Sequence, residues 1–371
     1  MISFQPTEDE IAFVDVSKKF ADKSLRPMMR EAEASEEIPN SIVKELNELG
    51  FLQLEESESV DGLALPLTTQ VQIHRALAYG DLAMVQGLPG LNDGASFLRV
   101  TTNHQLEDLF INKPETIAYI SAVNDQAFAT LQFRNNRLSG TSLPVRLAKI
   151  ATHFLIAIKN EAQETVLLLL PYEKDKLEIR GENRLGLAAA QIGTVTFHEK
   201  EITAEHVVAV GEEAEAIIRE AEMRIHVLQA AKQVGTMEAA CNYVTEYTAT
   251  RKAFGQEIAK FQAVSFRIAK MVTELRVTNH FVLEAANAID EQQENAHQKA
   301  RKTIYQAHKA IKYVTDSAVQ LLGGHGFVQD YPVEKWMRDA QAQVMLYGNT
   351  DCFRLAYGME LLDANEKVVI G

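Results

Sequence analysis

The chain has 371 residues, of which 46% are hydrophobic and 24% are charged. This composition is typical of a globular protein, and it excludes a disordered, collagen-like or disulfide-stapled chain. Since 51 Asp and Glu outnumber 37 Lys and Arg, the formal net charge is −14, which argues against a sequence-independent hold on nucleic acid. At roughly 150 residues per domain, the length predicts two or three domains.

Targeting and redox signals are sparse in this sequence. The N-terminus has no basic start followed by an apolar stretch, so we expect no secretory signal. The longest purely aliphatic run, Val166 to Leu170, is far shorter than a membrane span. Cys241 and Cys352 lack the spacing of a metal or redox motif and are predicted to be reduced core thiols. We therefore expect a soluble, cytoplasmic protein without a metal site.

Residues 1–114 have a helical pattern. Thr7 to Glu10 reads as a capping box, in which a hydroxyl and a carboxylate satisfy the first amides of a helix. Apolar residues from Ile42 to Leu49 recur on one helical face, and Gly50 follows them as a left-handed stop. A further helix is expected from Leu67 to Ala83, with a break at Gly80-Asp81.

Residues 115–211 change to the pattern of strands, with a turn at Asn135-Asn136. Because no helices separate these strands, an antiparallel barrel or sandwich is favoured over βαβ units. The predicted strands are Ala127 to Phe133, Arg137 to Gly140, Phe154 to Ile158, Val166 to Leu170 and Thr194 to His198. Residues 212–371 return to long helices, because apolar residues step by three and four. These stripes run from Met237 to Tyr247, from Val264 to Leu275 and from Ile304 to Leu321.

Four local features of the last third could carry chemistry. Arg251 to Gly255, followed by Phe261-Gln262, offers a guanidinium for phosphate or is a plain surface helix end. Gln320 to Gly326 either exposes backbone amides to a ligand or is a glycine C-cap, with His325 as a turn residue. Tyr331 to Asp339 reads as a well-built helix start. Leu346 to Asp351 marks a break between two helices, where side chains can line a pocket rim.

The order and spacing of these features resemble the acyl-CoA dehydrogenase family. RKAFG, FQ, QLLGGHG, YPVE, RDA and a Tyr-x-x-Thr segment follow in family order between Arg251 and Arg354. IPNSIVKELNELGF and RALAYGDLAMV resemble the family's helical N-terminal domain. The resemblance implies an α+β multi-domain fold. Its parts are an all-α N-terminal domain over 1–114, a β-barrel middle domain over 115–211 and a C-terminal four-helix bundle over 212–371.

The resemblance also implies bound FAD, held across a subunit interface in a homodimer or homotetramer. It further implies an acyl-CoA or related thioester of fatty acid metabolism as substrate and an electron-transfer protein as a candidate partner. Thr350 would contact the cofactor within its own subunit, and the other matching residues would reach the cofactor of the neighbouring subunit. The residues at the family's cofactor positions are Arg251, Phe254, Gln262, Gln320, Gly323, Gly324 and Thr350.

The positions that meet the flavin ring depart from the family pattern. Where relatives have Thr-Glu-Pro, this chain has a stretch from Ile120 to Asn124 that reads ISAVN. Where relatives have Trp-Ile-Thr, it has Pro144-Val145-Arg146. The lost aromatic face and hydroxyl contacts cost roughly 3–5 kcal/mol of ring binding. We hypothesise that Arg146 compensates by facing the electron-rich edge of the flavin.

The position of the catalytic base departs as well. Most relatives place a Glu directly after the Tyr of a Tyr-Glu-Gly-Thr segment, and this chain has Gly348 there. A minority place the Glu on an earlier helix, where this chain has Ile225 followed by His226. Glu222 and Asp351 are candidate substitutes, although each also reads as an ordinary solvated charge.

Three functions stay open on this basis. The first is an FAD-dependent oxidoreductase that acts on the CH–CH bond of an acyl-CoA thioester with a missing or displaced base, whose loss lowers the rate by roughly 10²–10⁴. The second is a flavin-dependent monooxygenase on the same scaffold. The third is a catalytically degenerate homologue that acts as a partner subunit or as a binder of acyl thioesters.

Overall fold

A computed structural model describes residues 7–56, 62–101, 103, 106–107, 109, 115–123, 130–347 and 350–363. By its internal contacts the chain divides into two compact units. Unit 1 comprises Met1–Pro27, Pro66–Leu82 and His226–Gly371, and unit 2 comprises Met28–Leu65 and Ala83–Ile225. Within the described residues, no helix combines the length and apolarity that a bilayer crossing requires. The domain boundaries at residues 114 and 211 stay a prediction.

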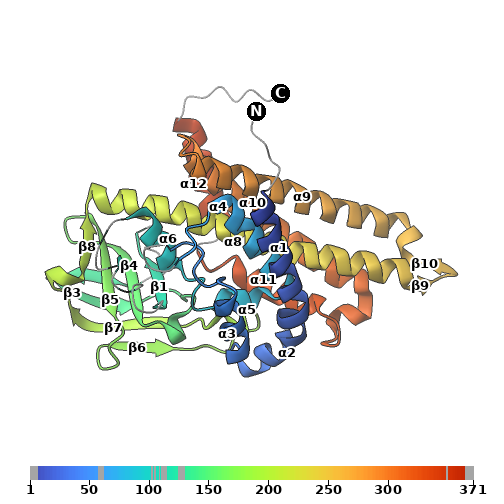
Figure 1. The fold of residues 1–371 in the computed structure, drawn as a ribbon, viewed down its shortest axis with the longest axis horizontal. Helices are drawn as coiled ribbons and strands as arrows, with labels where there is room; N and C mark the ends of the chain where they lie inside the picture. The colour runs from blue at the N-terminus through green and yellow to red at the C-terminus, as the bar shows by residue number, and fades with distance from the viewer. Residues whose placement is uncertain are drawn as a thin grey trace. The chain divides into compact units, whose positions relative to one another are not determined.

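Unit 1 is built almost entirely of helices, and α9 and α10 lie antiparallel beside each other (Figure 1). Its N-terminal elements are α1 (Glu8–Phe20), the π-helical turn η1 (Ala21–Leu25) and α4 (Leu67–Gly80). The helix α8 (Glu212–Thr250) belongs to unit 1 from His226 onward. The elements after it are β9 (Lys252–Ala253), β10 (Gln256–Glu257), η6 (Ile258–Lys260), α9 (Gln262–Asp290), α10 (Ala296–Leu322), η7 (Gly323–Phe327), α11 (Val333–Gln343) and α12 (Thr350–Asp363).

The apolar stripes of the sequence become the buried faces of these helices. Ile304, Ile311 and Val314 of α10 are fully buried, as a period of three and four residues requires. Gly235 allows α8 to pack closely on α4, because a Cβ at this position would lie 2.1 Å from the carbonyl oxygen of Arg75. The predicted long helices of the last third are therefore confirmed.

Unit 2 combines short helices with two four-stranded sheets. Its helices are α2 (Arg26–Ser35, from Met28 onward), α3 (Asn40–Glu48), α5 (Leu82–Gly87, from Ala83 onward), α6 (Asp93–Val100), η3 (Ala148–Ile150), η4 (Ala188–Ala190) and η5 (Ala204–His206). The strands are β1 (Ile117–Ser121), β2 (Gln132–Arg134), β3 (Arg137–Thr141), β4 (His153–Lys159), β5 (Thr165–Pro171), β6 (Leu177–Arg180), β7 (Thr194–Glu201) and β8 (Val207–Val210).

The two sheets of unit 2 face each other across one apolar core. Their strand orders are β1-β4-β5-β8 and β2-β3-β7-β6, and Phe154 of one sheet packs edge-on against Phe197 of the other with ring centroids 6.4 Å apart. The predicted middle β domain is confirmed, but its described strands form two open sheets rather than the expected closed barrel. Pairing is also not purely antiparallel: the β2–β3 hairpin lies in the other sheet, and β1 therefore pairs with β4 in parallel.

Local signals placed most boundaries correctly. α1 begins after Thr7, Gly50 ends the α3 turn with a φ of +74°, and α4 and α5 are separated at Asp81. Asn135 and Asn136 both have positive φ, as a two-residue hairpin turn requires. The strand expected from Ala127 begins only at Gln132 among the described residues.

The structure describes the side chain of only one of the two cysteines. Cys241 is a free, buried thiol, and burial raises its pKa to about 12, which confirms the core assignment. The side chain of Cys352 lies outside what the structure describes.

A buried ionic trio joins α11 to the end of α4. The Nζ atom of Lys335 lies 2.6 Å from Oδ2 of Asp81 and 2.7 Å from Oδ2 of Asp339. All three side chains are at most 2% exposed. Removing the cation would leave two carboxylates buried close to each other, which is far costlier than losing a surface pair.

We therefore expect Lys335→Met to lower the free energy of unfolding by about 3–5 kcal/mol. Lys44→Met is the matched control, because Lys44 forms only an exposed pair with Glu48 at 3.8 Å. That change should cost less than about 0.5 kcal/mol. Urea unfolding followed by circular dichroism measures both. Equal midpoints for the two variants would contradict a structural role for the trio.

Glu56 of unit 2 has a buried carboxyl group whose oxygens lack hydrogen-bond partners. It is 2% exposed, and neither carboxylate oxygen has a hydrogen-bond partner. Burial, with a contribution from the neighbouring Glu55 carboxylate, raises the pKa of Glu56 to about 8. The folded chain therefore keeps a proton that the unfolded chain releases near the ordinary value of a Glu.

This difference predicts that stability falls as the pH rises from about 5 to about 8. In that window the folded state binds more protons, so the free energy of unfolding loses up to about 1.4 kcal/mol per pH unit. Glu56→Gln removes this slope and should match wild type at pH 5 but exceed it at pH 8. Glu48→Gln, at an exposed position, should keep the wild-type slope. The account of Glu56 fails if urea unfolding shows the same pH slope in all three proteins.

Candidate functional site

One end of the unit 1 helices carries most of the predicted cofactor residues. Arg251 directly follows the last residue of α8, and the β9–β10 hairpin turns at Phe254 and Gly255 with φ of +54° and +86°. Gln262 is the first residue of α9. Because α10 runs back along α9, Gln320 in its last turn lies at the same end. We call this end, from Arg251 to Phe266 and from Gln320 to Phe327, the aromatic end.

The glycine turn η7 is anchored to α8 by aromatic residues. Tyr247 Oη and His325 Nδ1 share a hydrogen bond of 2.8 Å. The imidazole of His325 stacks on Tyr331 with ring centroids 4.6 Å apart and an interplanar angle of 9°. The expectation that His325 is only a turn residue is therefore wrong, because its side chain fixes the turn that carries Gly323 and Gly324.

Large rings and hydrogen-bond donors are exposed together at the aromatic end. The exposed rings and their exposed fractions are Phe254 (96%), Phe266 (68%, in the second turn of α9) and Phe327 (81%). Arg251 and Gln262 are exposed beside them, and a Cβ on Gly323 would meet nothing within 4 Å. Exposed rings in such a group indicate a binding surface, and a guanidinium with open backbone suits a phosphate group.

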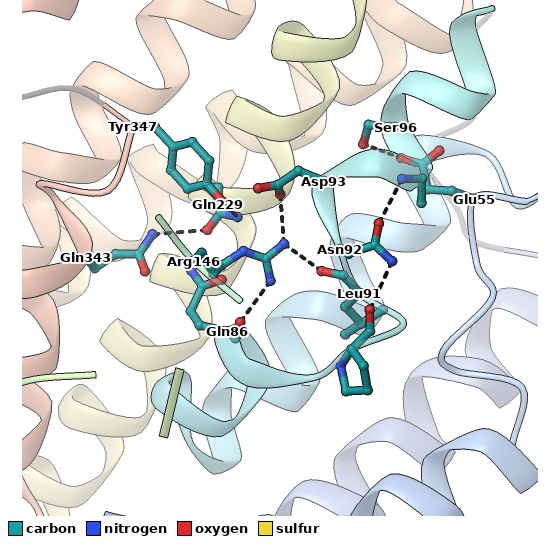
Figure 2. A network of polar contacts seen from close by, with 12 residues as sticks. Glu55, Gln86, Leu91, Asn92, Asp93, Ser96, Arg146, Gln229, Gln343 and Tyr347 are labelled. Carbon is teal, nitrogen blue, oxygen red and sulfur yellow. Dashed lines mark hydrogen bonds and ion pairs between the residues drawn. The ribbon is translucent and has the colours of Figure 1, made fainter. Parts of the chain in front are cut away.

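A second polar cluster of unit 1 joins α8, α11 and the residues before α12. Gln229 Nε2 donates to Tyr347 Oη at 3.1 Å, and Gln343 Nε2 donates to Gln229 Oε1 at 3.1 Å (Figure 2). Both glutamines are at most 1% exposed. The amide of Gln229 therefore bridges Gln343 and Tyr347. These bonds hold the residue that precedes the predicted base position against α8.

The structure describes only part of the predicted base segment. Gly348 and Asn349 lie outside the described residues, and so does the side chain of Thr350, which begins α12. Asp351 is exposed and forms a 3.1 Å ion pair with Arg354, whose side chain is 66% exposed. This candidate base therefore lies on the surface of α12 with a cation beside it.

Two histidines of unit 1 contact the same phenylalanine. The ring of Phe353 lies edge-to-face against His226 of α8 at 5.0 Å and against His308 of α10 at 5.4 Å between centroids. His308 is fully buried, and neither of its ring nitrogens has a hydrogen-bond partner. Burial, together with His226 and Lys312, lowers the pKa of His308 to about 3, so its ring is neutral at physiological pH.

Glu222, the other candidate base, is bonded within unit 2. Its Oε1 accepts hydrogen bonds from Tyr119 Oη at 2.8 Å and from Ser121 Oγ at 3.2 Å. Burial, followed by the Glu222 carboxylate, raises the pKa of Tyr119, which therefore stays a donor. The geometry favours Glu222 as a link between α8 and β1.

Arg146 of unit 2 is likewise engaged. Nη1 donates to the carbonyl oxygen of Gln86 at 2.9 Å, while Nη2 donates to the carbonyl oxygen of Leu91 at 2.7 Å and to Asp93 Oδ1 at 2.8 Å (Figure 2). The residue is 3% exposed. Its guanidinium therefore holds the connection between α5 and α6, and this gives no support to the hypothesis that Arg146 faces a flavin.

Sequence reasoning missed the buried polar partners of α8. Arg224 forms a forked pair with Glu55, with Nη2 to Oε2 at 2.7 Å, and Ser96 Oγ donates to the other Glu55 oxygen at 3.0 Å. These partners lie far apart in the chain, so no local pattern connects them. The available signal was the presence of polar residues, such as Arg224 and Gln229, inside the apolar stripe of a long helix.

Models of one protein family match both the N-terminal and the C-terminal part of the chain. A model of the acyl-CoA dehydrogenase N-terminal domain matches residues 7–107, and one of the C-terminal domain matches residues 220–362. Benzylmalonyl-CoA dehydrogenase of Aromatoleum aromaticum is 24% identical over an alignment of 380 residues. The alignment covers 97% of this chain and 100% of the relative.

Solved structures show the same fold. Butyryl-CoA dehydrogenase of Megasphaera elsdenii is similar with a TM-score of 0.85 and 21% identity, covering 97% of this chain and 100% of that one. An FAD complex of PigA is similar with a TM-score of 0.87 and 17% identity, covering 97% and 99%. Since the two family models together match more than half of its residues, the chain belongs to the acyl-CoA dehydrogenase family.

Proposed function

We propose that this protein binds FAD at the aromatic end and oxidises the CH–CH bond of an acyl-CoA thioester without a carboxylate at position 348. The observation that carries the proposal is the aromatic end itself. There, a ring that is 96% exposed, at Phe254, stands in a group with a guanidinium, two amide side chains and open glycine backbone. Exposed apolar groups of this kind are typical of sites that bind another molecule.

The residues present fit a dinucleotide. Arg251 would pair with the diphosphate through its planar fork, and Gly323 would let the phosphate oxygens approach the backbone. Exposed rings such as Phe254 would stack on the adenine, while Gln262 and Gln320 offer amide hydrogen bonds. FAD, when bound, supplies the hydride acceptor for the oxidation. The solved FAD complex of PigA, which has the same fold, supports this assignment.

The same surface favours self-association. Exposed phenylalanines at one end of a helical unit are typical of an association surface. A second copy of the chain would bury these rings and would also contribute the remaining residues of a cofactor site. We therefore propose a homodimer or a homotetramer, with an electron-transfer protein as the acceptor of the electrons.

A degenerate homologue that only binds acyl thioesters is the second candidate. One observation favours it: Gly348 has no carboxylate, and both substitute acids, Glu222 and Asp351, already have partners. Flavin binding without any reaction toward thioesters is the outcome that this candidate predicts.

Phe254→Ala should weaken FAD binding without unfolding the chain. Loss of one stacked ring costs about 1–3 kcal/mol, or roughly 5- to 150-fold in Kd. Leu185→Ala is the control, since Leu185 is an 80% exposed apolar residue of unit 2. Titration of apoprotein with FAD, followed by flavin fluorescence, gives the Kd of each protein. Equal affinity of both variants, or no binding by wild type, would contradict the proposed cofactor site.

Phe327→Asp should shift the protein toward monomers, because it places a charge on a ring position that the second copy is expected to cover. Leu185→Asp introduces the same charge at another exposed apolar position and should leave the mass unchanged. Sedimentation velocity at several protein concentrations distinguishes these results. A wild-type protein that sediments only as a monomer would exclude the proposed assembly.

A further inference from the structure

We propose that His325 belongs to the phosphate site at the aromatic end, and that its imidazole takes up a proton when the protein binds the diphosphate of a dinucleotide. This inference rests on the proposed function for the cofactor. It deepens that function by adding a charge-supplying residue outside the cofactor positions that the family resemblance gave.

The first support is position. His325 directly follows Gly324 in the turn η7. A Cβ on Gly323 or on Gly324 would meet nothing within 4 Å, so both glycines border open space. Since consecutive Cα atoms are only about 3.8 Å apart, a phosphate group at these glycines would lie close to the imidazole.

The second support is the way in which the imidazole is held. Nδ1 of His325 shares a 2.8 Å hydrogen bond with Tyr247 Oη, and the ring stacks on Tyr331 with centroids 4.6 Å apart. A neutral ring accepts this bond from the tyrosine hydroxyl, whereas a protonated ring donates it to the hydroxyl oxygen. The face of an aromatic ring such as Tyr331 also attracts a cation. Protonation therefore adds a charge without releasing the turn.

The third support is the direction of the helices. The helices α8 and α10 both end at the aromatic end, whereas α9 begins there. The C-terminal end of a helix carries a partial negative charge, which repels a doubly ionised diphosphate and favours an imidazolium. A protonated His325, three residues beyond the end of α10, would offset that repulsion.

The other charged groups on the surrounding elements do not supply this cation. Nearby basic side chains are already in ion pairs: Lys335 with Asp81 and Asp339, Arg338 with Glu334, and Lys252 and Lys260 with Glu257. Exposed acids add negative charge to the same elements: Glu246 of α8, Asp316 of α10 and Asp330 between η7 and α11. Arg251 carries a fixed charge, so His325 is the cation here that depends on pH.

The linkage fixes the sign of the pH dependence. The proton passes from solvent to the imidazole, and no bond of the dinucleotide forms or breaks. A bound diphosphate holds this proton more tightly, so the added affinity is present on the acid side and is lost as the pH rises. One charge near the diphosphate corresponds to about 3- to 10-fold in Kd.

The test is isothermal titration calorimetry of the full-length apoprotein with FAD and with ADP-ribose, from pH 6 to 8. Two buffers of different ionisation enthalpy give the protons taken up. ADP-ribose carries the same kind of diphosphate without a flavin. We expect wild type to take up protons with both ligands and to lose about 3- to 10-fold in affinity toward pH 8. His280→Gln, an exposed histidine of α9, should match wild type.

Two variants separate the charge from the holding of the turn. His325→Asn places an amide where Nδ1 stands, so it keeps a partner for Tyr247 and should bind both ligands without this proton uptake. His325→Gln is a second uncharged variant for the case that His325→Asn does not fold. Tyr247→Phe removes only the hydrogen bond, and should weaken binding about 2- to 10-fold at every pH while proton uptake remains.

The outcomes distinguish this inference from the proposed function. Binding of FAD with equal proton uptake in wild type and His325→Asn, or with no uptake in wild type, would overturn the role of His325 and leave the cofactor site intact. Binding of ADP-ribose with uptake that depends on His325, but no binding of FAD, would refute the proposed function alone. A wild-type protein that binds neither ligand would overturn both.

Discussion

The amide of Gln229 is the constraint on which the C-terminal segment of this protein depends. It is buried in α8, and it donates at one end to Tyr347 while it accepts at the other from Gln343. Both polar ends of this amide are therefore satisfied inside the helical unit, and one of them bonds Tyr347. One helical turn away on α8, the ring of His226 contacts the ring of Phe353 of α12. Tyr347 and Phe353 therefore both contact α8.

The aromatic end combines exposed rings with a glycine turn that is held firmly in place. Its rings contribute little to the stability of a single chain, because most of their surface remains in water. The hydrogen bond between Tyr247 and His325 and the stacking on Tyr331 nevertheless hold the adjoining glycine turn in one arrangement. Rigid support beneath an exposed apolar surface is typical of a binding site that is formed before its ligand arrives.

The fold could be predicted from the sequence where the signal is local or periodic. The stripe of α10, the glycine stop at Gly50 and the Asn135-Asn136 hairpin follow from residue spacing and backbone preference. The parallel pairing of β1 with β4 could not be predicted, because pairing depends on which sheet the intervening hairpin joins. Family positions indicated the residues of the aromatic end, whose roles stay a prediction.

Charged and polar partners were the least predictable part of the site. Arg146, which we hypothesised to face a flavin, donates to Gln86, Leu91 and Asp93, and these acceptors could not be predicted from a local pattern. In the sequence, His226 stood out only as the residue after Ile225, which occupies the alternative family position for a Glu. Its ring contact with Phe353, which lies more than a hundred residues further along the chain, could not be predicted from a local pattern.

The most direct test of the account is anaerobic titration of the FAD-loaded protein with an acyl-CoA, followed by the visible absorbance of the flavin. Both the cofactor site and the thioester chemistry must be present for the flavin to accept hydride. We expect the absorbance of the oxidised flavin to bleach as butyryl-CoA or an aryl-substituted acyl-CoA is added in the absence of oxygen. A bound flavin that stays fully oxidised with every thioester would contradict the assignment as a dehydrogenase.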